Sequence, residues 1–391
     1  MDKKKYTPKS SVEPLGVYLH IPFCRSKCPY CDFCSFPRPG TEVMTNYVTR
    51  LVSEIRAWGE KCRGRTVDTV YFGGGTPTLL SPADAERLLT AVFTHFSVEA
   101  GAEVTLECNP ATVSREALSV WTNGGVNRIS MGAQSAHENE LKALGRLHTW
   151  TDVCHTVEMA RQAGVDNINL DFMMGIPQQT PESLIETLKK AIELSPEHLS
   201  AYCLMLEEGT PFARRGAEAL GLPDEDVVAD LYELASDYIK SRGYEHYEIS
   251  NYAKAGKRSR HNLHTWQGRE YVGLGVAAHG YVDGVRYGNS RDLEGFLLGE
   301  DITESRAEIS RADAAFERVM LGLRLSDGID LSALTRDFPV LLTPAFDLTR
   351  LAFEKQGLLT YQNGRITLTE KGFLVSNHVI AALTDGMEIK A

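Results

Sequence analysis

The sequence predicts an α/β fold, in which parallel strands alternate with covering helices, followed by a small C-terminal α+β domain. Short apolar, β-rich runs are separated by longer stretches with apolar residues at three- and four-residue spacing, a pattern typical of strands covered by helices. Polar motifs come directly after several of these runs, at the edge where parallel α/β folds carry their chemistry. Six strand–helix units indicate either an incomplete barrel or a doubly wound sheet.

Six apolar runs are expected to form the parallel strands. In chain order they read GVYLHI, DTVYFGG, EVTLEC, NRISMG, DNINLDF and HLSAYCL. Helices are expected over residues 43–61, 82–96, 137–163, 181–194 and 224–242, where apolar residues recur with the period of a helix that packs on a sheet. Right-handed crossovers between these elements give a parallel sheet, whose carboxyl ends lie at one edge.

The sequence divides into four parts. Residues 1–15 form a polar, basic tail that is expected to be flexible, and residues 16–242 form the strand–helix unit. Residues 243–308 are rich in glycine and aromatic residues and are expected to be irregular strands that cover the rim of that unit. Residues 309–391 show a helix, two strands joined by a turn at QNGR, and a final helix, an order similar to that of a winged-helix domain.

Composition limits the classes of function. The chain carries 41 Lys and Arg against 52 Asp and Glu, a net charge of −11, which disfavours a nucleic-acid partner. The N-terminal residues lack the apolar core of a signal peptide, and no run reaches the roughly 18 apolar residues of a membrane span. We therefore expect a cytoplasmic protein, in which eight cysteines indicate metal or redox chemistry rather than disulfides.

Four of the cysteines, Cys24, Cys28, Cys31 and Cys34, lie close together after the first predicted strand. The CPYC stretch permits a glutaredoxin-like thiol exchange, and four thiolates would also satisfy zinc. The third interpretation is a [4Fe-4S] cluster held by Cys24, Cys28 and Cys31 in the spacing CxxxCxxC, which leaves the fourth iron open to a ligand. Because a fourth thiolate would close that position, Cys34 is not expected to be a cluster ligand.

Further polar groups follow the next strands. In FGGGTPT, the successive glycines let the backbone approach a ligand closely, although they could serve only a tight turn. Glu107 can accept hydrogen bonds from an amino or hydroxyl group, Gln134 can donate and accept, and Arg146 can pair with a carboxylate. Asp171 ends an apolar strand and is expected at the same rim, where a carboxylate suits a ribose diol or a positive charge. Each of these side chains could also be an ordinary helix-end or surface group.

The segments YLHIPFCRSKCPYCDF, GGGTPTLL, GVNRISMGAQS, NLDFMMGIPQQT and YEISNYA together resemble the HemN-like group of radical S-adenosylmethionine (SAM) proteins. The resemblance covers nearly the whole chain and implies a partial (β/α)6 barrel. It implies a [4Fe-4S] cluster on Cys24, Cys28 and Cys31, with SAM bound at the open iron. By motif position, it implies SAM contacts at Tyr18, Tyr30, Gly74, Gly75, Thr76, Glu107, Gln134, Arg146 and Asp171.

The HemN-like group contains oxygen-independent coproporphyrinogen III oxidases and the haem chaperones of the HemW branch. The oxidases carry CxxxCxxCxC and a longer N-terminal extension, whereas here Asp32 and Phe33 follow Cys31, which resembles the chaperones. RHNLHTW is similar to the HNxxYW motif associated with haem binding, with Thr265 in place of Tyr, and Cys34 stands where the chaperones usually have Asn. The resemblance implies haem contacts at His261, Asn262, His264 and Trp266. The other interpretation is that His261 and Asn262 only hydrogen-bond a loop in place.

The expected function is therefore that of a haem chaperone. Its partners would be haem, a one-electron donor and a haem-accepting protein, for which a membrane-bound respiratory haem enzyme is the candidate. Two alternatives remain at this point. One is radical decarboxylation of coproporphyrinogen III to protoporphyrinogen IX, and the other is a radical SAM enzyme that modifies or degrades haem.

Overall fold

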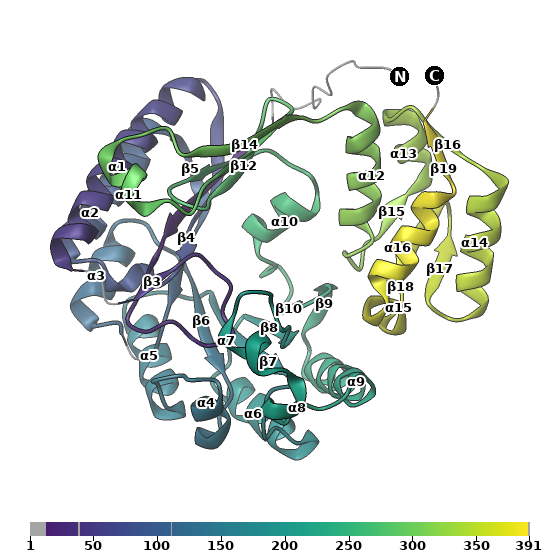
Figure 1. Ribbon diagram of the computed structural model, residues 1–391, viewed down its shortest axis with the longest axis horizontal. Coiled ribbons are helices and arrows are strands. Elements are labelled where there is room, and N and C mark those ends of the chain that lie inside the picture. Colours follow the sequence, from purple (N-terminus) through teal and green to yellow (C-terminus); the bar gives the residue numbers. More distant parts are fainter. Residues whose placement is uncertain (1–12, 38–39, 111, 390–391) are drawn as a thin grey trace.

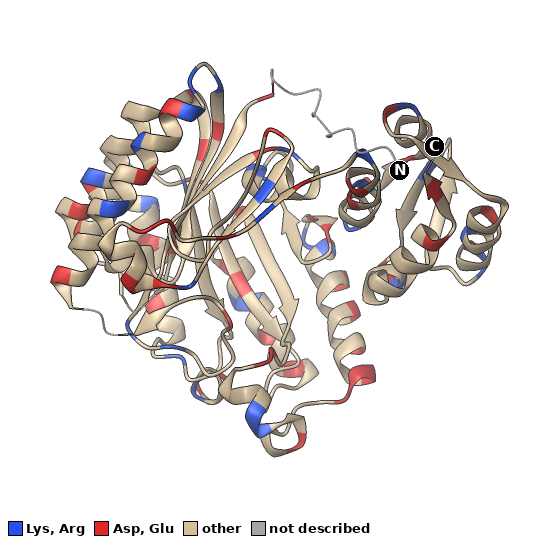
Figure 2. Cartoon of the chain, turned by 45° about the horizontal axis from the view of Figure 1, so that its top comes forward, with Lys and Arg blue, Asp and Glu red and all other residues tan. Residues whose placement is uncertain are grey.

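One twisted sheet of twelve strands runs through most of the molecule (Figure 1). The computed structural model describes residues 13–37, 40–110 and 112–389. The strand order is β14-β13-β12-β11-β1-β4-β5-β6-β7-β8-β10-β9. Among the described residues, none of the helices combines the length and apolarity that a membrane span requires. Acidic and basic residues are interspersed along the outer helices (Figure 2).

The six predicted parallel strands are confirmed and lie side by side in chain order. They are β1 (Leu15–Ile21), β4 (Thr66–Gly74), β5 (Ser97–Cys108), β6 (Arg128–Gln134), β7 (Ile168–Met174) and β8 (His198–Cys203). Each pairs in parallel with the next. The order never reverses, as it would in a doubly wound sheet. The fold is therefore a partial (β/α)6 barrel.

Helices cover the outer side of these strands. They include α1 (Thr41–Lys61), α2 (Pro82–His95), α3 (Arg115–Asn123), α6 (Pro181–Glu193) and α9 (Glu225–Ser241), and α3 was not expected from the sequence. Local residues explain where several of them begin: the Ser81 side chain accepts a hydrogen bond from the backbone N–H of Asp84, and Thr180 forms a capping box with Ser183. Such caps satisfy backbone N–H groups that have no partner inside the helix.

The single helix predicted over residues 137–163 is wrong. The structure has α4 (Glu138–Ala143) and α5 (Trp150–Gln162), separated by a short loop. Gly145 takes a φ of +69°, which ends the first helix, and Thr149 starts the second with a capping box to Asp152. The break places Arg146 in a loop at the carboxyl edge of the sheet, where a continuous helix could not have presented it.

The strands predicted within residues 243–308 are present, but they pair into the main sheet instead of covering its rim. The segment forms β9 (Glu245–Glu248), β10 (Asn251–Ala253), α10 (Arg260–Trp266), β11 (Tyr271–Leu274), β12 (His279–Val282), β13 (Val285–Asn289), α11 (Leu293–Leu298) and β14 (Thr303–Glu308). Its strands extend the sheet at both ends, with β11 parallel to β1. Helix α10 packs against β4 and against the C-terminal domain.

The C-terminal domain is α+β. It comprises α12 (Arg311–Gly322), β15 (Ile329–Asp330), α13 (Leu331–Asp337), β16 (Val340–Leu342), α14 (Pro344–Lys355), β17 (Leu359–Gln362), β18 (Arg365–Leu368), α15 (Glu370–Leu374), α16 (Ser376–Asp385) and β19 (Met387–Ile389). The predicted hairpin is confirmed: Asn363 and Gly364 both take positive φ, as a tight two-residue turn requires.

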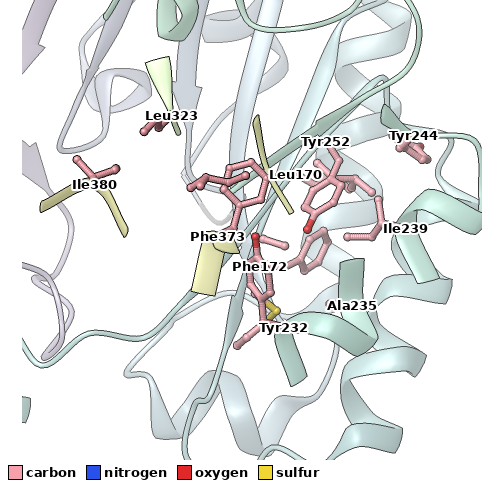
Figure 3. Close-up of a cluster of buried hydrophobic side chains, with 14 of the residues drawn as sticks. Leu170, Phe172, Tyr232, Ala235, Ile239, Tyr244, Tyr252, Leu323, Phe373 and Ile380 are labelled. Carbon is pink, nitrogen blue, oxygen red and sulfur yellow. The ribbon is translucent and has the colours of Figure 1, made fainter. Parts of the chain in front are cut away.

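The barrel and the C-terminal domain share one apolar core. Figure 3 shows Leu170 and Phe172 of β7 in the same cluster as Tyr232, Leu323 and Phe373. A polar contact closes the junction: the carboxylate of Glu370 accepts hydrogen bonds from Ser236, Lys240 and His246. Burial alone would raise the pKa of Glu370, but these hydrogen bonds and the nearby positive charges outweigh it and lower the pKa to about 2.

Two buried carboxyl groups make folding stability depend on pH. Burial raises the pKa of Glu54 and of Glu248 to about 7, although backbone N–H groups and the nearby Lys61 and His246 oppose the shift. A raised pKa contributes stability that is complete below about pH 4.3 and is lost as the pH rises to about 7.

We expect the Glu54→Gln/Glu248→Gln variant to lose less unfolding free energy than wild type between about pH 5 and pH 8 in urea denaturation. Equal losses would contradict the prediction.

Candidate cofactor and ligand site

A cavity opens at the carboxyl ends of β4 to β8, with about 1040 Å³ of unfilled space, open solvent included. Eleven of the predicted cluster and SAM residues line it: Cys24, Cys28, Tyr30, Cys31, Gly74, Gly75, Thr76, Glu107, Gln134, Arg146 and Asp171. The fold thus brings together residues that lie far apart in the sequence.

Three cysteines of one loop face this cavity. Thr76 Oγ1 lies 3.7 Å from Cys24 Sγ, and Arg146 Nη1 lies 3.7 Å from Cys28 Sγ. The sulfur atoms of Cys24 and Cys28 therefore each have a hydrogen-bond donor beside them. Burial raises the pKa of the Cys24 and Cys31 thiols. Binding to a metal would therefore be needed to hold them as thiolates.

Cys34 lies apart from these three cysteines. Cys34 is buried in the apolar core formed by β1 and α1. It is not among the described residues that line the cavity. Its carbonyl oxygen accepts a hydrogen bond from His20 Nε2 at 2.9 Å. Since that nitrogen carries the proton, His20 Nδ1 accepts a hydrogen bond from the hydroxyl group of Tyr18, and the two atoms are 2.9 Å apart. The backbone contact thus fixes Cys34 in the wall behind the loop.

Three cysteines form the candidate donor set for a metal centre. Within the described part of the chain, no three His, Cys, Asp or Glu side chains converge on one point as the ligands of one ion would. A zinc ion needs such convergence. Thiolates on a [4Fe-4S] cube bind separate irons and can stand around a larger centre. Cys24, Cys28 and Cys31 are each half-buried at the cavity, and their thiolates are the ligands that such a cluster takes.

The glycine loop after β4 is pressed against the start of the cysteine loop. Gly75 N donates to Ile21 O at 2.8 Å, and Thr76 N donates to Phe23 O at 2.7 Å. A Cβ at Gly75 would lie 2.6 Å from the carbonyl oxygen of Phe23. Gly74 takes a φ of +105°, a conformation that favours glycine. These contacts leave no room for a side chain and fix the position of the cysteine loop.

Replacing Gly75 by Ala is expected to weaken SAM binding and to destabilise the fold. The new methyl group would collide with backbone, which cannot rotate away, and overpacking of this kind typically costs about 1–3 kcal/mol. Gly101→Ala is the matched control, since a Cβ there meets nothing within 4 Å. Thermal unfolding and equilibrium SAM binding measure both effects. Wild-type values for Gly75→Ala would contradict this account of the loop.

Two carboxyl groups lie inside the cavity. Glu107 accepts hydrogen bonds from Tyr71 Oη and from Gly74 N, both at 2.9 Å, and burial raises its pKa to about 7. Asp171 accepts from Asn169 Nδ2 at 2.6 Å, and burial raises its pKa as well. A buried carboxylate is stabilised by a positive charge beside it. The sulfonium and ammonium groups of SAM would supply such charges.

Cationic and amide groups occupy another part of the cavity lining. Arg146 Nη2 donates to Gly132 O at 2.8 Å, but its buried Nε has no hydrogen-bond partner among the described residues. An unpaired buried donor of this kind suits an anionic ligand group. Gln134 is held at a φ of +65°, and its Oε1 accepts the hydroxyl of Tyr202 at 3.1 Å.

Tyr202 lines the cavity but was not singled out in the sequence. No motif marks it, and its position near the end of β8, at the same edge as the other rim residues, is the one signal that could have identified it. Conversely, Tyr18 was predicted as a SAM contact but is not part of the lining among the described residues. Its ring lies in the barrel interior, 6.0 Å from that of Tyr71.

The four predicted haem residues lie on α10, away from this cavity. His261 is buried, with Nδ1 3.0 Å from Thr69 Oγ1, and its ring centroid is 5.0 Å from that of Tyr71. His264 is also buried, with Nε2 2.8 Å from Asp68 Oδ1. These contacts support the interpretation that the histidines hold their own segment in place. Haem contacts at His261, Asn262, His264 and Trp266 remain a prediction.

Comparison with known proteins agrees with this geometry. Residues 18–191 match the radical SAM superfamily, and residues 309–375 match the HemN C-terminal domain. The protein named Heme chaperone HemW from Lactococcus lactis subsp. lactis (strain IL1403) is 36% identical over 94% of this chain and 96% of its own length. Its namesakes from Escherichia coli (strain K12) and Bacillus subtilis (strain 168) are 37% and 32% identical, each over 94% of this chain.

Among solved structures, coproporphyrinogen III oxidase (HemN) from Escherichia coli, described as a radical SAM enzyme, superposes with a TM-score of 0.83. The match covers 95% of this chain and 90% of that chain, at 24% sequence identity. At that identity, the match establishes the shared fold alone.

Proposed function

This chain belongs to the HemW family of radical SAM proteins, and from that membership we propose that it is a haem chaperone, which binds haem and transfers it to an acceptor protein. The observation that carries the proposal is the similarity to heme chaperones from several bacteria over 94% of the chain. The acceptor is a haem protein, for which a membrane-bound respiratory enzyme remains the candidate, and a one-electron donor would serve the cluster. We place this activity in the cytoplasm.

The cavity supports the proposed cofactors. Cys24, Cys28 and Cys31 would hold the [4Fe-4S] cluster, which supplies one-electron chemistry and an open iron when bound. Glu107 and Asp171 would stabilise the positive groups of SAM by their buried charge. The backbone of the glycine loop, with the N–H of Gly74 fixed on Glu107, would fit against the methionine part of SAM.

Arg146 would hold the anionic end of SAM. Its guanidinium bridges Gly132 O and Cys28 Sγ, so it links the cysteine loop to the β6 side of the cavity. Tyr202 would act through Gln134. Its hydroxyl group donates a hydrogen bond to the Gln134 amide oxygen and so orients the amide N–H groups for a ligand in the cavity. These residues bind, orient and shield the cofactors.

The decisive experiment compares two tetrapyrroles side by side. Anaerobically reconstituted protein is incubated with SAM, a reductant and either haem or coproporphyrinogen III. We expect stoichiometric haem binding, transfer to an apo-haem protein and no protoporphyrinogen IX. Formation of protoporphyrinogen IX would defeat the chaperone proposal in favour of the oxidase. A haem-dependent product would instead indicate a haem-modifying enzyme.

A further inference from the structure

A chain of buried polar residues runs through the interior of the barrel. It begins at Ser259, the residue before α10, and ends at Asp171 in the cofactor cavity. Between them lie Asn169 of β7, His198 of β8 and Tyr247 of β9. The four residues other than Asp171 are each at most 2% exposed. Burial of polar groups is unfavourable unless each finds a partner, so the direction of their hydrogen bonds is informative.

The carboxylate of Asp171 fixes the direction of the chain at the cavity end. Asn169 Nδ2 lies 2.6 Å from Asp171 Oδ1, and an ionised carboxylate can only accept. The amide nitrogen of Asn169 therefore faces Asp171, and it also donates to Ser130 Oγ at 2.8 Å. The amide oxygen of Asn169 is left to accept from His198 Nδ1, at 2.6 Å. His198 must therefore carry its proton on Nδ1.

The backbone at the start of α10 fixes the same direction independently. Ser259 N donates to Tyr247 Oη at 3.2 Å, and a backbone N–H group cannot accept. The hydroxyl proton of Tyr247 is then free for His198 Nε2, which lies 2.8 Å from Tyr247 Oη. With its proton on Nδ1, His198 can accept at Nε2, so the two ends of the chain agree. Every donor of the chain thus points toward Asp171.

This arrangement requires a neutral His198, because an imidazolium has no acceptor. Burial and the nearby guanidinium of Arg128 lower the pKa of His198 well below its usual range. Arg128 is itself 1% exposed. Among the described residues, no carboxylate lies within 4.0 Å of its guanidinium and its Nε has no hydrogen-bond partner. Its positive charge opposes the protonation of both His198 and Asp171.

We propose that Asn169, His198 and Tyr247 are positioning residues of the SAM site, which hold the Asp171 carboxylate in place through a one-directional chain of hydrogen bonds from α10. This role rests on the proposed SAM site and does not depend on which tetrapyrrole the protein handles. Hydrogen bonds that point the same way polarise one another, so the chain strengthens its last donor, the Asn169 amide. SAM affinity should therefore respond to His198 and Tyr247, although neither is among the described residues that line the cavity.

The first test is a SAM titration of the full-length, cluster-loaded protein. Tyr247→Phe removes one hydroxyl group and is expected to weaken SAM binding by about threefold to tenfold, the contribution of one hydrogen bond. Tyr244→Phe is the matched control, because that buried hydroxyl donates to Pro196 O, at 2.6 Å, outside the chain. Both variants should lose similar unfolding free energy in urea, and only Tyr247→Phe should lose SAM affinity. Wild-type affinity in Tyr247→Phe, or an equal loss in Tyr244→Phe, would overturn the proposal.

The loss of SAM affinity in Tyr247→Phe should grow as the pH falls. Burial raises the pKa of Asp171, and hydrogen bonds from Ser200 and Asn169 oppose that shift. A weaker Asn169 donor lets the pKa rise further, so Asp171 takes up its proton at a higher pH in the variant than in wild type. SAM titrations of both proteins between about pH 6 and pH 9 measure the difference. A loss that is the same at every pH would indicate a structural effect alone and reject the proposal.

The comparison of the two pH profiles isolates Asp171 because its surroundings are otherwise unchanged. The charged and titratable side chains that face it, all of which the variant retains, are Tyr71 of β4, Glu107 of β5, Arg128 of β6, Arg146 of the loop after α4 and Tyr202 of β8.

A second test reads the tautomer of His198 without SAM. Nitrogen nuclear magnetic resonance of the full-length protein before cluster reconstitution should show a neutral imidazole with its proton on Nδ1, identified by the signals that His198→Gln lacks. The other tautomer, or an imidazolium, would overturn the proposal.

Conservative replacement of His198 gives a third readout. His198→Gln should keep SAM affinity nearer to wild type than His198→Leu, because its amide can still donate to Asn169 and accept from Tyr247. Equal losses in the two variants would count against the chain. Failure of the cluster-loaded wild type to bind SAM would reject the proposed SAM site itself.

Discussion

Cys28→Ser is expected to abolish binding of the iron–sulfur cluster, and Cys34→Ser is expected to leave it intact. Both changes remove one thiol from the same loop, so they differ only in where that thiol points. Cys28 faces the cavity beside Arg146, whereas Cys34 is packed behind the loop in the apolar core. A cube held by three thiolates loses a required ligand in the first variant and none in the second.

Two measurements after anaerobic reconstitution test this prediction. They are the iron and sulfide content and the electron paramagnetic resonance spectrum of the reduced protein. SAM should perturb that spectrum in wild type and in Cys34→Ser, because both retain an open iron. Loss of the cluster in Cys34→Ser would show that the fourth cysteine is a ligand. Zinc in place of iron, in protein protected from oxygen, would reject the cluster assignment altogether.

Glu107→Gln is expected to weaken SAM binding by about tenfold or more. The substitution preserves size but removes the buried charge, and hydrogen bonds to charged groups contribute about 1.5–3 kcal/mol. It also replaces an acceptor for Gly74 N and Tyr71 Oη by an amide that can satisfy only one of them with its oxygen. We therefore expect the glycine loop to lose its fixed position.

Glu103→Gln is the matched control for this prediction. Glu103 lies on the same strand and faces the same interior, but it accepts the backbone N–H groups of α10 rather than those of the glycine loop. SAM affinity, measured by isothermal titration of the cluster-loaded protein, should stay near wild type in Glu103→Gln. Equal losses in both variants would mean that any buried carboxylate on β5 matters only for folding.

Elements with a strong local signal could be predicted from the sequence. The six strands were identified because apolar runs alternate with helical spacing, and the hairpin because Asn363 and Gly364 suit a tight turn. The single helix over 137–163 failed because its apolar pattern continues across a break that a capping residue and one glycine impose. The strands of 243–308 were placed wrongly because strand pairing depends on distant partners, and an edge position in a sheet leaves no mark on a short run.

The chemistry follows from the amino-acid sequence alone: the residue types at the rim, the spacing of three cysteines, and the parallel order that collects them at one edge. Which of these groups lie in the same cavity depends on the tertiary structure. It separated Cys34 from the other cysteines, brought Tyr202 to Gln134, and buried His261 and His264. The physical reason is that ligand type is a property of the side chain, whereas direction and burial depend on contacts between residues far apart in the chain.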